Sequence, residues 1–103
     1  MLWYNHLYVG EKAKKHRFTI IQKLRKNQIQ PGIYVITPAS NPNNIMDIYS
    51  TMMLFEAPIE TKEWMVIGIA DGYQEALELC REIVDAMYQK TGAFCLREFL
   101  EEK

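Results

Sequence analysis

The sequence predicts a single α+β domain, a two-layer sandwich with the ferredoxin-like split βαβ topology. Two segments, residues 11–27 and 73–88, place apolar side chains at helical spacing. Four short runs rich in β-branched and aromatic residues flank these segments, so the predicted order is strand, helix, strand, insertion, strand, helix, strand. The insertion, residues 39–63, is expected to hold an extra strand or short helix. A small parallel α/β sheet is the alternative.

The first predicted unit spans residues 2–37. Residues 2–9 alternate two sets of mostly apolar and aromatic side chains, which is typical of a strand, and Gly10 ends the run. Residues 11–27 form the first predicted helix, with its apolar side chains on one flank: Ala13, Ile20, Ile21 and Leu24. After a Pro-Gly pair, residues 33–37 are continuously β-prone, as in a strand buried on both faces.

The insertion carries mixed signals. Residues 39–44 are rich in Asn and Pro and predict a surface loop. Residues 45–55 contain both a helix-start pattern and β-prone side chains, and we expect a short helical turn followed by a strand. Residues 56–63 are polar and predict a second loop.

The second predicted unit contains the strongest helix signal of the chain. A buried strand is expected at residues 64–70, followed by Asp71 as N-cap, with Gln74 completing a capping box. Apolar side chains recur at helical spacing through residues 73–88, and Gly92 supplies a left-handed stop. Residues 94–100 are expected to form the last strand of the sheet.

The bulk composition fits one folded domain covering residues 1–103. The chain is 49% hydrophobic and 24% charged, close to an average globular protein. No apolar run approaches the length of a membrane span, and the first residues lack a signal-peptide pattern, so we expect a cytoplasmic protein that does not enter a membrane. Cys80 and Cys95 show no paired spacing and are expected to be reduced thiols.

Charge is distributed unevenly along the chain. Residues 1–30 contain seven Lys or Arg and one acidic residue, whereas residues 31–103 contain five and twelve. The basic helix 11–27 is therefore a candidate contact for an anionic ligand or nucleic acid, although a solvated face is the more ordinary interpretation. The candidate contact residues are Lys12, Lys15, Arg17, Lys23 and Lys26.

Two further charge features belong to the predicted helices. Arg17 falls on the apolar flank of the first one, which indicates either a later helix start or a guanidinium held by a carboxylate. Along the second helix, acidic residues follow the predicted solvent side and would serve for solubility or meet a basic helix of another subunit: Glu75, Glu78, Glu82 and Asp85.

An aromatic face is predicted on the first strand, where Tyr4, His6 and Tyr8 point to the same side. Aromatic residues exposed on a four-stranded sheet can stack on nucleic-acid bases. However, the aromatic sequence signature of RNA-binding sandwiches is absent, and packing against helices or a partner subunit is the favoured interpretation.

No catalytic, cofactor or metal motif is recognised in the sequence. The two His and two Cys lack the close spacing of zinc ligands, and no glycine-rich phosphate loop or nucleophile elbow occurs. We therefore expect no cofactor and no metal, and an interaction domain is favoured over an enzyme.

The leading functional hypothesis is a non-catalytic interaction or regulatory domain that self-associates as a homodimer. It rests on a surplus of large apolar residues around the insertion: Met52, Met53, Leu54, Phe55 and Trp64. The alternatives are binding of nucleic acid or an anionic ligand through helix 11–27, and a small enzyme with an unrecognised site.

Overall fold

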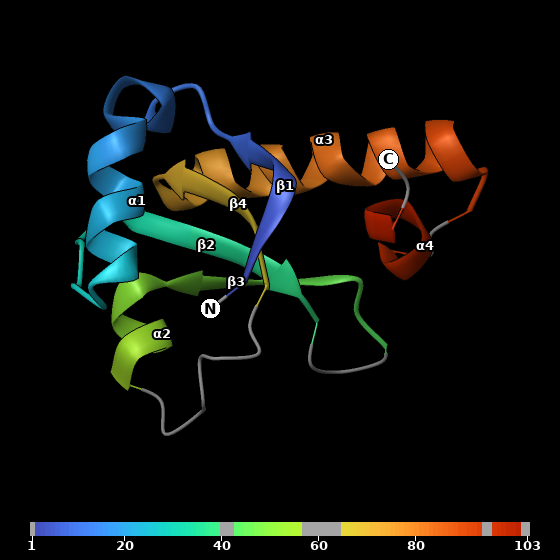
Figure 1. Cartoon of the computed structure of the whole chain (residues 1–103). Coiled ribbons are helices and arrows are strands. Elements are labelled where there is room, and N and C mark those ends of the chain that lie inside the picture. Colours follow the sequence, from blue (N-terminus) through green and yellow to red (C-terminus); the bar gives the residue numbers. More distant parts are fainter. Residues whose placement is uncertain (1, 40–42, 57–64, 94–95, 102–103) are drawn as a thin grey trace.

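The computed structural model describes residues 2–39, 43–56, 65–93 and 96–101, and of Glu56 only the backbone. Figure 1 shows a four-stranded sheet with helices packed around it. The predicted α+β fold is confirmed. The elements in chain order are β1 (Leu2–Val9), the 3-10 helix η1 (Ala13–His16), α1 (Arg17–Arg25), β2 (Ile33–Pro38), β3 (Met46–Ser50), α2 (Thr51–Glu56), β4 (Met65–Asp71), α3 (Tyr73–Thr91) and α4 (Leu96–Glu101).

The strand order of the sheet is β1-β4-β2-β3, so β1 and β3 form its two edges. β1 runs parallel to β4, whereas β4 and β3 both run antiparallel to β2. The pairing of β1 with β4 is irregular, because the register shifts between Trp3 and Tyr8. The sheet is therefore mixed, with its only parallel pair among the described strands at the β1 edge.

The ferredoxin-like topology is not confirmed. A split βαβ unit needs two parallel strands with an antiparallel strand between them. Here β4 does lie between β1 and β2, but β1 is parallel to β4 and hence antiparallel to β2. The predicted last strand, residues 94–100, is also wrong for its described part, because α4 occupies Leu96–Glu101.

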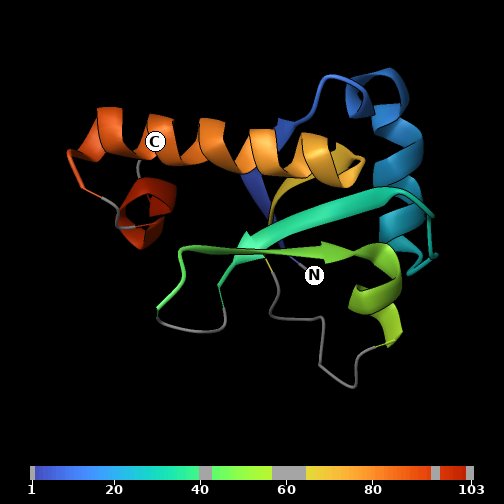
Figure 2. The same cartoon turned by 180° about the vertical axis from the view of Figure 1, so that it is seen from behind.

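The apolar side chains of the sheet form two clusters on its opposite faces. Neighbouring residues of a strand point to opposite sides, and accordingly Val35 lies in one cluster and Ile36 in the other. Helix α1 and Leu54 of α2 pack on the first face, whereas α3 and Phe99 of α4 pack on the second. Figure 2 shows α3 along the side of the sheet away from α2. The α+β arrangement of a four-stranded mixed sheet with helices is compatible with the expected two-layer fold, and helices contact both faces of the sheet.

In the basic segment, the apolar residues face the core as predicted, but the α-helix starts later than predicted. Ala13, Ile20 and Leu24 are buried, and Ile21 is half-buried. Residues 13–16 form the 3-10 helix η1, and the α-helix begins only at Arg17, whose side chain is exposed. Of the two explanations for Arg17, the later helix start is the one observed.

The inserted segment has its two elements in the reverse of the predicted order. Strand β3 comes first, and helix α2 follows it. Ser50 provides the start signal that sequence reasoning missed, because its Oγ accepts a hydrogen bond from the backbone N–H of Met53 at 3.1 Å, as an N-cap does. The β-prone residues Ile48 and Tyr49 therefore precede the helix.

Helix α3 begins with a different cap from the one predicted. Its N-cap residue is Gly72, which has no side chain to bond, so the expected Asp71 and Gln74 capping box is wrong. Instead Glu75 turns back, and its Oε1 accepts a hydrogen bond from the backbone N–H of Asp71 at 3.0 Å. At the other end, Gly92 adopts φ 71° and stops the helix, as predicted.

Glu75 also reaches the beginning of η1. Its carboxylate accepts hydrogen bonds from the backbone N–H groups of Lys12 at 2.8 Å and Ala13 at 3.2 Å. Partial desolvation raises the pKa of this carboxyl, but the three N–H donors and the charge of Lys12 outweigh it, so the pKa lies below its ordinary value. Glu75 is thus a half-buried link between two helix starts, and its predicted place in a solvent stripe is wrong.

Candidate functional site

The candidate contact residues of the basic segment lie on the surface of η1 and α1. Lys12, Lys15, Arg17, Lys23 and Lys26 are all exposed. The ion pair of Lys14 with Glu11, at 3.1 Å, is the only one that this segment makes within the described residues. Arg25 lies over the ring of Trp3, 5.8 Å from its centroid. Most of the positive charge therefore faces solvent without a carboxylate partner.

The aromatic ring of Phe18 is exposed to solvent within this basic surface. The side chain of Phe18 is 82% exposed, the largest value among the large hydrophobic residues described. Phe18 lines a hollow of about 240 Å³ together with cationic and polar residues: Lys14, Lys15, His16, Arg17 and Thr19. Sequence reasoning missed Phe18, although a helical wheel turns it away from the flank of Ile20 and Leu24.

A second hollow continues along α1. It has a volume of about 330 Å³ and shares His16 and Thr19 with the first one. Lys23 and Ile29 lie farther along the same hollow. The two hollows together form the α1 groove, which we define by His16, Phe18, Thr19, Lys23 and Ile29.

The predicted aromatic face of β1, formed by Tyr4, His6 and Tyr8, is separated from the α1 groove. The rings of Tyr4 and Tyr8 stack at 6.5 Å between centroids, and His6 meets Tyr4 edge-on at 5.7 Å. All three line a hollow of about 400 Å³ with residues of α3 and α4: Ala86, Lys90 and Phe99. Tyr4 and Tyr8 pack against the cluster beneath α3, whereas α1 packs on the opposite face. The structure therefore does not bring the two predicted candidate sets together.

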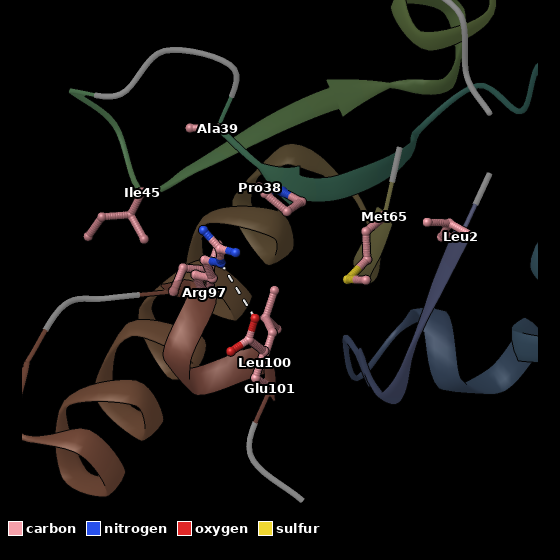
Figure 3. Close-up of a pocket in the computed structure, with 9 residues that line it drawn as sticks. Leu2, Pro38, Ala39, Ile45, Met65, Arg97, Leu100 and Glu101 are labelled. Carbon is pink, nitrogen blue, oxygen red and sulfur yellow. Dashed lines mark hydrogen bonds and ion pairs between the residues drawn. The ribbon is translucent and has the colours of Figure 1, made fainter. Parts of the chain in front are cut away.

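An apolar pocket of about 420 Å³ lies between α4 and the ends of the strands (Figure 3). Its apolar lining comes from five segments: Leu2, Pro38 and Ala39, Ile45, Met65, and Leu96 with Leu100. The lining side chains that carry charge, Arg97 and Glu101, pair at the rim at 3.4 Å and are 88% and 70% exposed. The pocket has the size of a ligand site, but none of the described residues that line it is a buried polar side chain able to orient a ligand.

Groups suited to catalysis are sparse in the part of the chain that the structure describes. Burial raises the pKa of the Cys80 thiol to about 11, so this thiol is protonated and weakly nucleophilic at neutral pH. No cluster of three or more His, Cys, Asp or Glu that could hold a metal ion occurs among the described residues. Cys95 lies outside them.

The edge strand β1 has an unusual composition for its position. Its eight residues include no Lys, Arg, Asp, Glu or Pro, which are the residues that commonly protect an exposed edge. No described strand pairs with its outer side, because α4 takes the place of the strand expected in the sequence after α3. None of the eight side chains is fully buried. By contrast, the other edge strand, β3, is five residues long and carries Asp47.

Only some of the large apolar residues of the insertion are exposed. Leu54 is buried and Phe55 half-buried, whereas Met52 and Met53 are exposed on α2. Trp64 lies outside the described residues. No helix of the described chain has both the length and the apolarity to cross a membrane.

No protein-family model, curated protein or solved structure matches this chain.

Proposed function

We propose that this protein is a non-catalytic interaction domain that self-associates, as a homodimer, through the open edge of β1. The observation that carries the proposal is an uncharged edge strand of eight residues with no described strand on its outer side. Such an edge presents a row of unpaired backbone N–H and C=O groups, which form a template for another strand. A second copy of the chain presents the same β1 edge, so two copies can pair with each other.

The expected contact is antiparallel pairing of two β1 strands around a two-fold axis perpendicular to the sheet. This axis keeps each side chain on its own face, so Trp3 and Leu7 of one copy neighbour Trp3 and Leu7 of the other on the α1 side. Tyr4 and Tyr8 do the same on the α3 side. Aromatic and apolar cross-strand pairs of this kind contribute about 0.2–1 kcal/mol each. Two four-stranded sheets would then form one continuous sheet.

The free, half-buried thiol of Cys80 agrees with a reducing compartment, and we propose the cytoplasm as the location. Self-association there needs neither a disulfide nor a metal.

Light scattering coupled to size-exclusion chromatography tests the proposal on the full chain. We expect a mass of about twice 12.1 kDa at micromolar concentration. Asn5 and His6 are exposed in the middle of β1, one on each face. The double variant Asn5→Lys/His6→Lys places like charges at the shared edge, and we expect it to weaken the dimer by roughly tenfold or more.

A matched control separates edge pairing from a simple charge effect. Asn44→Lys adds positive charge at an exposed position just before β3, the opposite edge strand of the sheet, and should leave the dimer intact. Hydrogen exchange gives a second readout, because the outward N–H groups of β1 should become protected as protein concentration rises. A wild type that stays monomeric at high micromolar concentration would refute the proposal, as would a lysine variant that dimerises as tightly as the wild type.

A further inference from the structure

Among the described residues, the basic segment and a set of acidic residues lie on opposite faces of the sheet. The basic residues belong to η1 and α1, which pack over the first apolar cluster. The acidic residues Glu78, Glu82 and Asp85 are exposed on α3, which packs over the second. The sequence pI of about 6.1 is therefore an average that conceals a basic surface and an acidic surface among the described residues.

The basic surface combines positive charge with an exposed aromatic ring. Between Lys12 and Lys26 the sequence has seven Lys or Arg and no acidic residue, which suits a partner with regularly repeated negative charge. Phe18 adds an exposed flat ring beside Lys15 and Arg17 in the same hollow. The face of this ring is free to stack on another flat ring.

We propose that the α1 groove binds single-stranded nucleic acid, with Phe18 stacking on a base and Lys15 and Lys23 contacting phosphates. A nucleic-acid strand alternates flat bases with phosphates and so satisfies both the ring and the cations. Single strands fit better than duplexes, because only unpaired bases expose their faces for stacking.

Two other anionic partners match the surface less well. An acidic peptide would neutralise the lysines, but its carboxylates would make no stacking contact with the exposed ring of Phe18. A membrane surface would need several large apolar side chains projecting together from a basic helix. In η1 and α1, Phe18 is the only large hydrophobic residue that is exposed, as all of these residues are described. The site is separate from the β1 edge, so it does not depend on dimer formation.

Fluorescence anisotropy with a labelled 12-nucleotide oligouridine tests the proposal. We expect binding at low salt that weakens as salt rises. Phe18→Ala should weaken binding by roughly fivefold or more without changing the salt dependence, because it removes stacking and no charge. Lys15→Gln and Lys23→Gln should each reduce the slope of log affinity against log salt by about 0.7, because each removes one phosphate contact.

Arg81→Gln is the matched control. It also removes one positive charge from an exposed position, but on α3, and we expect both affinity and slope to stay within twofold of the wild type. Thermal melts of all variants should agree within a few degrees, since each substituted side chain is exposed.

Competition experiments distinguish the alternative partners. Duplex DNA, polyglutamate and vesicles containing phosphatidylserine should each displace the oligonucleotide more weakly than unlabelled oligouridine does. Equal displacement by polyglutamate or by vesicles would overturn the proposal in favour of a general anion surface. Absence of binding at low salt, or a Phe18→Ala variant with wild-type affinity, would also overturn it.

Discussion

Replacement of Glu75 by alanine should destabilise this protein far more than its partly exposed position indicates. The carboxylate accepts hydrogen bonds from three backbone N–H groups and serves the beginnings of both η1 and α3. Loss of a capping side chain costs about 0.5–2 kcal/mol for one helix end. With two ends affected, we expect Glu75→Ala to lower the free energy of unfolding by about 2 kcal/mol and the melting temperature by about 10 °C.

Urea denaturation followed by circular dichroism measures this loss. Glu78→Ala is the control, because it removes the same side chain from an exposed position one turn along α3, and its effect should stay within about 0.5 kcal/mol. Equal stability of the two alanine variants would refute the role of Glu75 as a link between helix starts.

The contribution of Glu75 to the stability of the fold should decrease at acidic pH. The pKa of Glu75 is lowered in the folded protein, because its backbone hydrogen bonds outweigh desolvation. Its charge therefore stabilises the fold above the pKa of the unfolded chain, and this contribution is lost as pH falls through the lowered folded pKa. The difference in free energy of unfolding between the wild type and Glu75→Gln should be largest at pH 7 and should decrease below about pH 4. A difference that does not change with pH would contradict this assignment.

Three further predictions concern other contacts. A Cβ at Gly10 would collide with the Glu75 carboxylate, so Gly10→Ala should destabilise the wild type but cost much less in a Glu75→Ala background, as a double-mutant cycle would measure. The hydroxyl of Thr51 accepts from the backbone N–H of Gln30 at 2.7 Å and donates to its C=O at 2.8 Å, in a buried site. Thr51→Val should therefore cost about 1–3 kcal/mol in urea denaturation, and more than Thr51→Ser, which keeps the oxygen. With its thiol pKa at about 11, against 9.0 for an ordinary thiol, Cys80 should react with iodoacetamide at pH 8 roughly 100-fold more slowly than a free thiol, measured in a variant whose other cysteine is serine.

The sequence predicted best those elements whose signal is local. Helix α3 was expected because its apolar residues recur at helical spacing over several turns and Gly92 follows them. Strands β1 and β2 were expected, at residues 2–9 and 33–37, because β-prone residues stand between strong turn signals.

The errors arose where local signals compete. The apolar and aromatic content of residues 94–100 favoured a strand, yet Leu96, Phe99 and Leu100 also stand at helical i, i+3 and i+4 positions. In the structure this spacing places Phe99 in the cluster beneath α3, and Arg97 pairs with Glu101 along the helix. The packing against α3 that favours the helix is not encoded within the segment.

Strand order and surface sites depend on contacts between distant residues. The parallel pairing of β1 with β4 joins residues more than sixty positions apart, as Leu2 lies opposite Met65. Lys12, Lys15, Lys23 and Lys26 were expected on the solvent side of the helix, and they are exposed. Arg17 was expected on the apolar flank, and it is exposed because the α-helix starts late. The exposure of Phe18 could have been inferred from the sequence, because the buried flank of the helix was predicted correctly and Phe18 lies on the opposite side.

The pairing of β1 with β4 also has a consequence for synthesis on the ribosome. The first strand to be made can pair with its neighbour in the sheet only after residues 65–71 have been added. At about 5–20 residues per second, some sixty residues take roughly 3–12 s, during which an uncharged, aromatic strand remains without its sheet. A nascent chain arrested before residue 65 should therefore be captured by a chaperone that binds extended apolar segments, and release should follow once β4 has emerged.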